Sequence, residues 1–340
     1  MEFDIPLGFV SDDPGAVAAR AEKDGLGAVW SAEAGHDPYL PLAAVAAATE
    51  RITFGTAIAV AFPRSPMVHA QVAWDLHRMA PGRFVLGLGA QVKAHNERRY
   101  GVPGDHPVAR MRDVVRAIRA IWRCWQGGEK LAYRGEFYQH TLMTPFFSPG
   151  PVGDGPPPAI YLAAVTAAML EVAGAEAEGV HVHPLHTERF LDDVVLRTAR
   201  EAASGAGRRP AAMGFAVPAM IATGRTAEDV DRAKPAVRAQ IAFYASTPSY
   251  REVLNIEGRG EVADKLHALS RTGRWGDMPE LIDDELFASV CTAATWGNLA
   301  AALASRYRGR ATRLMPYSIL GDGTPWAEIA AELKQGAATA

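Results

Sequence analysis

Short apolar runs alternate with helical patterns along most of the chain. We expect strands at residues 3–10, 28–33, 52–62, 84–89, 160–165, 179–184, 213–223 and 312–319. Several of these runs are apolar throughout, as parallel strands are when helices cover both faces of their sheet. Strands that alternate with helices indicate βαβ units, so the fold class we predict is α/β. Eight such strands predict a TIM (β/α)8 barrel, and a long open sheet is the alternative.

Helix start signals support this alternation. Asp13 and Ser65 each precede a proline, and both pairs read as an N-cap followed by proline at the first helical position. Thr226 and Asp229 have the spacing of a capping box, with Asp in place of the usual Glu. We therefore expect helices to begin directly after residues 13, 65 and 226.

Two segments interrupt the alternation. Residues 131–138 predict a hairpin around Arg134-Gly135, and residues 145–158 form a connection rich in proline and glycine. Residues 240–286 are too many for one strand-to-helix connection and predict two or three helices. We expect a single domain over residues 1–340, with insertions at about 127–158 and 240–290. Long insertions in barrels usually cover the carboxyl ends of the strands, where barrel chemistry lies.

Composition narrows the function classes. Of the 340 residues, 49% are hydrophobic and 21% charged, and the formal net charge is −3. This charge provides no electrostatic basis for binding nucleic acid or an anionic membrane. The first residues show no signal peptide, no apolar stretch has the length of a membrane span, and two cysteines cannot build a disulfide framework. We expect a cytoplasmic protein that acts on a small molecule.

Glycines and histidines lie where several strands are expected to end. Gly87 and Gly89 suggest a dinucleotide fingerprint, but Val92 stands where its last glycine belongs, so we reject it. The histidines at positions 181, 183 and 186 could be metal ligands, but no acidic or histidine partner stands nearby at ligand spacing. We expect no metal, and we expect His183 to lie at a pocket mouth.

Two further residues have a functional and a structural interpretation of about equal weight. His36 follows the second strand, where it could handle a proton or serve only the loop structure. Thr166 follows the fifth strand, where it could cap a helix or mark a helix start that binds phosphate. The sequence lacks the nucleophile elbow GxSxG, the Walker phosphate-binding loop and the metalloprotease motif HExxH. We therefore expect a cofactor to carry the chemistry.

Four motifs follow one another in a specific order along the chain. They are GTAI at 55–58 followed by RSP at 64–66, GRFVLGLG at 82–89, NE at 96–97, and YLAAVT at 161–166 followed by AG at 173–174 and Gly179. Together they resemble the bacterial luciferase-like superfamily, and most closely its oxidoreductases that use the deazaflavin coenzyme F420. The resemblance covers nearly the whole chain and implies a barrel with the deazaflavin lying across the strand carboxyl ends.

The resemblance also implies roles for particular residues. It places a cis peptide bond between Ala57 and Ile58, against the middle of the deazaflavin ring. It places the ring above Gly89 and makes Asn96 a cofactor contact. It assigns His36 a position near the reactive ring carbon.

The cofactor phosphate has its own implied site, formed by backbone of four residues: Ala163, Ala164, Val165 and Thr166. The candidates for contact with the substrate are Tyr39 and His183. These two residues and a bound water are the alternatives to His36 as proton donor. Residues 90–95 carry no carboxylate where a related sugar-phosphate dehydrogenase has its catalytic glutamate. The substrate and acid–base partner of that relative therefore cannot be carried over.

The sequence thus predicts an F420-dependent oxidoreductase that transfers hydride between C5 of the deazaflavin and a small organic substrate. The first alternative is a monooxygenase on the same fold that uses reduced FMN. The second is a barrel that binds flavin without catalysis. Relatives in the family are often dimers, so a homodimer is an expectation by analogy.

Overall fold

The computed structural model describes residues 1–7, 13–317 and 323–338. Its main sheet is parallel and has 11 strands in the described residues. They are β1 (Glu2–Phe3), β2 (Ile5–Pro6), β3 (Ala28–Ser31), β4 (Thr53–Thr56), β5 (Ala59–Val60), β6 (Phe84–Gly89), β9 (Ala159–Ala163), β10 (Gly179–His181), β11 (Gly214–Gly224), β12 (Cys291–Thr295) and β13 (Arg313–Tyr317). A short antiparallel hairpin joins β7 (Tyr133–Arg134) to β8 (Gln139–His140).

The sheet closes on itself. Its strands follow the order β1-β13-β11-β10-β9-β6-β4-β3-β2, with β5 beside β6 and β12 beside β11. β1 pairs with β13, while β2 pairs with β3, and a single residue separates β1 from β2. The two ends of the strand order therefore belong to one stretch, residues 2–6. This confirms the predicted TIM barrel.

Each of the eight predicted runs contains a strand, with three differences from the prediction. The first run is divided into β1 and β2. The run at 52–62 is divided into β4 and β5, which are separated by a cis peptide bond between Ala57 and Ile58. β12 was not predicted, and it pairs with the far end of β11, beyond the part of β11 that pairs with β10. The predicted strand residues 8–10 and 318–319 lie outside the described residues.

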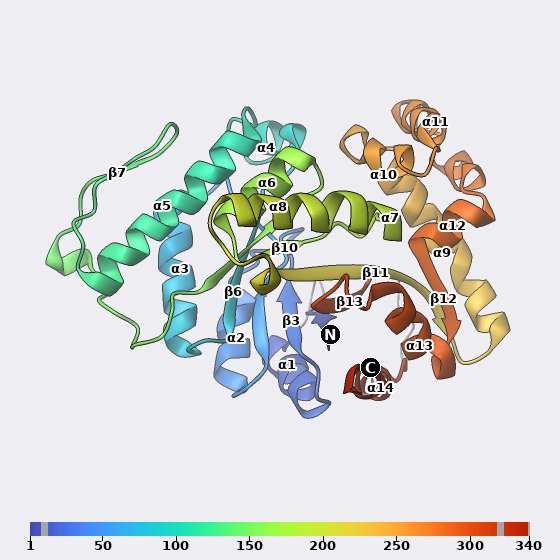
Figure 1. The fold of residues 1–340 in the computed structure, drawn as a ribbon, viewed down its shortest axis with the longest axis horizontal. Coiled ribbons are helices and arrows are strands. Elements are labelled where there is room, and N and C mark those ends of the chain that lie inside the picture. The colour runs from blue at the N-terminus through green and yellow to red at the C-terminus, as the bar shows by residue number, and fades with distance from the viewer. Residues whose placement is uncertain (8–12, 318–322, 339–340) are drawn as a thin grey trace.

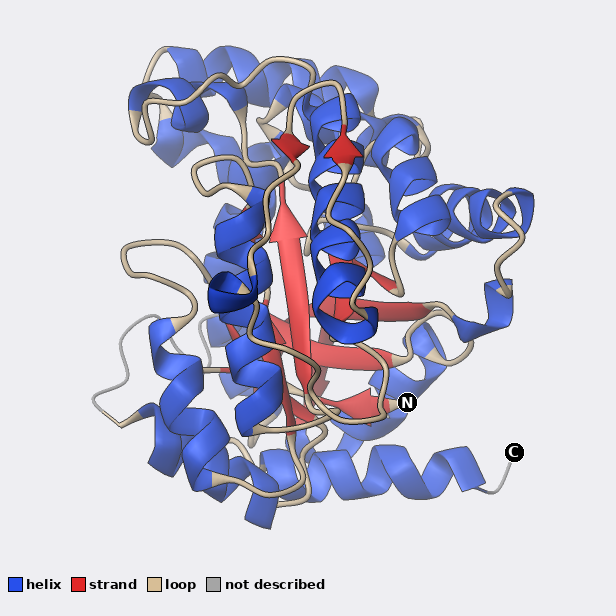
Figure 2. Cartoon of the chain, turned by 90° about the vertical axis from the view of Figure 1, so that its left-hand side faces the viewer, coloured by secondary structure: helices blue, strands red, loops and turns tan. Residues whose placement is uncertain are grey.

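Helices surround the strands (Figure 2). They are α1 (Pro14–Lys23), α2 (Leu40–Ala48), α3 (Pro66–Met79), α4 (Lys93–Arg98), α5 (Pro107–Gly127), α6 (Ala167–Glu176), α7 (Glu188–Phe190), α8 (Arg197–Gly205), α9 (Ala227–Ala245), α10 (Arg251–Asn255), α11 (Gly260–Arg271), α12 (Asp284–Val290), α13 (Trp296–Tyr307) and α14 (Trp326–Ala338). A π-helical stretch, Leu191–Leu196, joins α7 to α8, and 3₁₀ turns occupy Pro145–Phe147, Pro210–Ala212, Pro248–Tyr250 and Trp275–Leu281. In the described part of the chain, no helix combines the length and the apolar character needed to cross a bilayer.

The predicted helix starts are confirmed. The Asp13 carboxylate accepts a hydrogen bond from the Ala16 amide at 2.9 Å, and Ser65 caps α3 in the same way. At α9, Thr226 and Asp229 form a full capping box. These caps satisfy amides that would otherwise lack partners at the helix start.

The hairpin and the helices after α9 lie at opposite ends of the long axis of the molecule (Figure 1). The hairpin is the one predicted around Arg134-Gly135. Buried Asp113 on α5 fastens it by accepting hydrogen bonds from the Tyr133 hydroxyl and from two hairpin amides. At the other end, α10, α11 and α12 follow α9, in agreement with the two or three helices predicted there.

A cluster of polar side chains lies inside the barrel. Trp30 Nε1 donates to the fully buried Asp4 carboxylate at 2.8 Å, and Arg313 donates to its other oxygen at 3.1 Å. Burial raises the pKa of Asp4, while the Arg313 charge opposes that rise. The His181 ring stands edge-on to Trp30 at 4.9 Å. Gly87 is required here because a Cβ would lie 1.7 Å from the Thr56 carbonyl oxygen.

Candidate active site

His36 lies in the loop that follows β3 at the carboxyl end of the barrel. Its side chain is exposed and makes no hydrogen bond or ion pair with the described residues. The next residue, Asp37, fixes the loop because its carboxylate accepts from the Tyr39 amide at 2.8 Å and from the Arg64 guanidinium at 2.8 Å. An anchored loop with a free imidazole allows His36 to reach a substrate, and its catalytic role stays a prediction.

A buried ion pair ties this loop to the next strand. The side chain of Glu33 is 5% exposed, and its Oε2 accepts from Arg64 Nη1 at 2.8 Å and from the Val60 amide at 2.7 Å. Its Oε1 accepts from the Tyr100 hydroxyl at 3.0 Å. Glu33 thus connects the end of β3, the strand β5 and the loop after α4.

The peptide bond between Ala57 and Ile58 is cis, as the resemblance implies. Hydrogen bonds to the preceding strand hold this bend, from the Ala57 amide to the Ser31 carbonyl at 2.7 Å and from the Glu33 amide to the Ile58 carbonyl at 3.1 Å. The Ile58 side chain packs over Gly89, where a Cβ would lie 2.6 Å from Ile58 Cδ1. Ala57, Ile58 and Gly89 therefore meet at the carboxyl ends of β4 and β6.

Asn96 carries an unsatisfied polar atom. The residue is 1% exposed, and its amide nitrogen donates to the Ala90 carbonyl at 2.9 Å. Its Oδ1 is buried and has no hydrogen-bond partner among the described residues. A buried acceptor without a partner is costly, so a ligand that donates a hydrogen bond there would be favoured. This residue fits the cofactor contact that the resemblance assigns to it.

The helix α6 begins shortly after β9, the fifth of the predicted strands. Thr166 caps α6, and its hydroxyl accepts from the Met169 amide at 3.4 Å. Ala163 pairs with His181 of β10, and Thr166 and Ala167 are exposed beyond the strand end. Amides in the first turn of a helix have no partner within the helix and can bind an anion. The amides that fit the implied phosphate site are therefore those at the start of α6, next to Thr166, because the Ala164 amide already donates to the His181 carbonyl at 3.4 Å. Phosphate binding at residues 163–166 stays a prediction.

The three neighbouring histidines have three different settings. His181 is 8% exposed inside the barrel, and burial lowers its pKa to about 3. His183 lies at the end of β10 between the rings of Tyr244 at 4.7 Å and Tyr250 at 4.0 Å. Burial also lowers the pKa of His183 to about 3, so its ring is neutral. His183 follows the end of β10, and its place at a pocket mouth stays a prediction.

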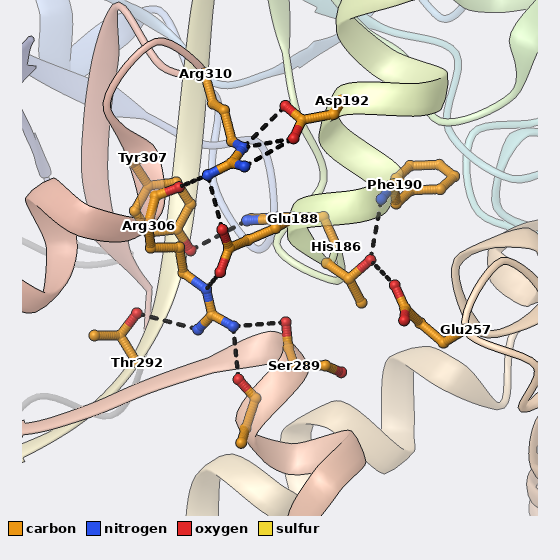
Figure 3. Close-up of polar contacts among 12 residues, drawn as sticks. His186, Glu188, Phe190, Asp192, Glu257, Ser289, Thr292, Arg306, Tyr307 and Arg310 are labelled. Atoms are coloured by element: carbon orange, nitrogen blue, oxygen red, sulfur yellow. Dashed lines mark hydrogen bonds and ion pairs between the residues drawn. The ribbon is translucent and has the colours of Figure 1, made fainter.

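Hydrogen bonds of His186 fix the loop that carries His183, and Figure 3 shows the one between His186 and Tyr307. His186 Nδ1 donates to the His183 carbonyl at 2.8 Å, and the Tyr307 hydroxyl donates to His186 Nε2 at 3.2 Å. Burial lowers the pKa of His186 to about 4. Nearby, Arg310 binds the carboxylates of Glu188 at 2.7 Å and Asp192 at 2.8 Å. These contacts fix α7 against α13.

Tyr39 turns into the protein interior. It is 5% exposed, and its hydroxyl donates to His69 Nδ1 at 2.7 Å, while His69 Nε2 donates to the Ala61 carbonyl at 2.9 Å. Burial raises the pKa of Tyr39 and lowers the pKa of His69 to about 4, so both groups are neutral. Contact between Tyr39 and a substrate stays a prediction, and the structure gives its hydroxyl an internal partner.

Sequence reasoning missed five residues that shape this region: Glu33, Arg64, Tyr244, Tyr250 and Tyr317. Glu33 could have been found, since it is the acidic residue at the end of the apolar run predicted as a strand at 28–33. The three tyrosines come from separate elements, and only the folded chain shows that they meet.

Comparison with known sequences relates the chain to one family. The profile of the luciferase-like monooxygenases matches residues 11–313. An uncharacterized protein of Mycobacterium tuberculosis (strain H37Rv) is 43% identical over 299 residues, which cover 88% of each chain. A phthiodiolone/phenolphthiodiolone dimycocerosates ketoreductase of Mycobacterium sp. (strain JLS) is 35% identical over 204 residues, which cover 58% of this chain and 50% of the ketoreductase.

Solved structures share the fold. A coenzyme F420 dependent tetrahydromethanopterin reductase from Methanopyrus kandleri has a TM-score of 0.76 at 19% identity over 97% of both chains. An F420-dependent secondary alcohol dehydrogenase, in complex with an F420-acetone adduct, has a TM-score of 0.72 at 17% identity over 98% of both chains. An EDTA monooxygenase from Chelativorans sp. BNC1 has a TM-score of 0.73 at 14% identity over 100% of this chain and 93% of that one. At these identities the likeness is one of fold alone.

Proposed function

The chain belongs to the luciferase-like monooxygenase family, and on that premise we propose that it is an F420-dependent oxidoreductase acting on a small organic substrate. The observation that carries the proposal is the buried Oδ1 of Asn96, which has no partner among the described residues. Asn96 lies in α4, the helix that follows β6, where the family resemblance expects a cofactor contact. Two structural neighbours that are named as F420-dependent, and a ketoreductase among the relatives, support deazaflavin chemistry.

When bound, the deazaflavin supplies the carbon that gives or takes the hydride. The chain's own residues have the tasks of binding and orientation. Asn96 offers its Oδ1 to a donor on the ligand, and the start of α6, directly after residues 163–166, offers amides to a phosphate. Glu33 and Arg64 keep the bend at Ile58 in place through the Val60 amide.

His36 has the task of moving a proton. Reduction of a carbonyl group requires a proton on oxygen in addition to the hydride, and oxidation of an alcohol requires its removal. Imidazole is the side chain best suited to exchange a proton near neutral pH. His36 has no other partner in the described part of the chain, and residues 90–95 hold no carboxylate that could replace it.

A second candidate is a monooxygenase that uses reduced FMN, which the EDTA monooxygenase neighbour favours. Two assays separate the two functions, an anaerobic one with reduced F420 and an aerobic one with reduced FMN. Protein with reduced F420 and a panel of ketones and aldehydes should restore the visible absorbance of the oxidised deazaflavin. Consumption of oxygen with reduced FMN, and no reaction with reduced F420, would support the monooxygenase instead.

A further inference from the structure

A continuous line of rings leads from the end of β10 to the protein surface. It consists of His183, Tyr244, Phe243 and Trp275, which we call the aromatic row. The ring of His183 lies 4.7 Å from that of Tyr244, Phe243 lies 5.5 Å from Tyr244, and Trp275 lies 6.0 Å from Phe243. Phe243 and Trp275 are each 50% exposed. The row therefore begins at the candidate active site and ends in solvent with two rings available for contact.

A pair of hydroxyl groups lies beside the inner end of the aromatic row. The Tyr244 and Tyr317 hydroxyls are hydrogen-bonded to each other, and Tyr317 ends the barrel strand β13. Burial, reinforced by the Tyr317 neighbour, raises the pKa of Tyr244, so that its hydroxyl keeps its hydrogen. Two hydroxyls that share one hydrogen bond leave one further O–H that can donate. The Gln240 side chain also contacts the Tyr244 hydroxyl. That further O–H can donate a hydrogen bond to a carbonyl or hydroxyl oxygen.

Three cations close to the aromatic row in the sequence have acidic partners. Lys234 and Arg238 are the cations of α9 that come nearest to Phe243 in the chain, and Arg274 precedes Trp275. Their ion pairs are Lys234 with Asp231 at 2.6 Å, Arg238 with Asp284 at 2.7 Å, and Arg274 with Asp277 at 2.6 Å. A phosphorylated or carboxylated substrate gains little from cations that already have partners, whereas aromatic rings favour a flat, uncharged one.

We propose that the aromatic row binds the substrate and that the substrate is an uncharged carbonyl compound, or the matching alcohol, that carries an aromatic ring. The proposal rests on the function proposed above and specifies its substrate class. The substrate ring packs against Phe243 and Trp275, and its oxygen accepts the free hydrogen of the Tyr244–Tyr317 pair.

Ligand-detected NMR titration of the full chain, alone and saturated with F420, tests this inference. The probes are acetophenone and acetylcyclohexane, two methyl ketones of similar size of which only the first has an aromatic ring. Because an aromatic contact contributes about 0.5–1.5 kcal/mol beyond its buried area, acetophenone should bind about three- to tenfold more tightly. Phe243→Ala and Trp275→Ala should each remove most of that preference.

Matched variants distinguish the contribution of the aromatic row from the general effects of a substitution. Phe146→Ala removes an 89% exposed ring that lies outside the aromatic row, in the 3₁₀ turn Pro145–Phe147, and should leave both affinities unchanged. Tyr317→Phe should change little, because Tyr244 then donates its hydrogen to the ligand. The double variant Tyr244→Phe/Tyr317→Phe removes both hydroxyl donors. It should weaken the binding of both ketones by about three- to tenfold.

The outcomes distinguish the two proposals. Equal affinities for the two ketones, with no effect of Phe243→Ala or Trp275→Ala, would overturn the aromatic substrate class even if F420 binds. Failure of F420 to bind, while acetophenone keeps its dependence on Trp275, would overturn the proposed function and support the aromatic surface.

Discussion

The Glu33 carboxylate holds together three segments of the candidate active site, so its removal should lower the stability of the fold. Its two oxygens accept from the Val60 amide, the Arg64 guanidinium and the Tyr100 hydroxyl, at 2.7, 2.8 and 3.0 Å. Glu33→Ala removes all three contacts and leaves the Val60 amide without its acceptor. Glu33→Gln keeps the shape of the side chain and removes only the charge.

The two substitutions should differ in magnitude. Loss of one partner from a buried ion pair costs about 3–5 kcal/mol. Arg64 keeps Asp37 as a partner and is 20% exposed, so we expect about 3 kcal/mol for Glu33→Ala. In Glu33→Gln the amide NH₂ can face the Tyr100 hydroxyl, which rotates to accept, and the remaining oxygen keeps its two donors. We expect about 1–1.5 kcal/mol for this loss of charge.

Urea unfolding followed by circular dichroism measures both changes in the free energy of unfolding. Glu129→Gln is the matched control, since that side chain is 64% exposed and lies 3.7 Å from Arg123. It should change stability by less than about 0.5 kcal/mol. If Glu33→Ala lies within about 1 kcal/mol of the unaltered protein, the carboxylate does not hold these segments together and the reasoning is wrong.

Three further predictions concern the site and its titration. His36→Ala should lower turnover by about 10²–10⁴ with nearly unchanged cofactor affinity, and steady-state kinetics that retain a third of kcat would show a structural role. Asn96→Leu should weaken F420 binding by about 1–3 kcal/mol in an absorbance titration, and unchanged affinity would remove its assigned contact. The buried rings of His69, His181 and His186 have pKa values of about 4, 3 and 4, below the 6.5 of an unfolded chain. The unfolded state therefore takes up protons first as pH falls below 6.5, and urea unfolding should show stability falling by about 1 kcal/mol per histidine between pH 7 and 5.5. Constant stability over that range would contradict the buried, neutral rings.

The barrel strands could be predicted because their residues carry the signal locally. Each run of strand residues is apolar enough to be buried on both faces, and Asp13, Ser65 and Thr226 mark helix starts through their own side chains. β12 carries no such signal. Its sequence, CTAAT, is made of small residues, of which the first two are buried and the last three are not. Within the described part of the chain, it pairs with β11 alone, outside the barrel ring.

The candidate site was predictable only in part, for a physical reason. His36, Asn96 and Thr166 each follow a strand in sequence, so their place at the carboxyl end could be inferred from the strand pattern. The partner of the Tyr317 hydroxyl is Tyr244, 73 residues away and in another element. No pattern in the sequence predicts this contact, because it depends on how α9 packs against the end of β13.

The central claim is that this barrel holds a deazaflavin, and equilibrium binding tests it most directly. Oxidised F420 and FMN are titrated separately into the protein, and each affinity is determined from the change in ring absorbance. The account predicts tighter binding of F420 and a loss of that affinity in Asn96→Leu. Binding of FMN that is tighter than that of F420 by tenfold or more would contradict it and would identify the protein as a flavin-dependent member of the family.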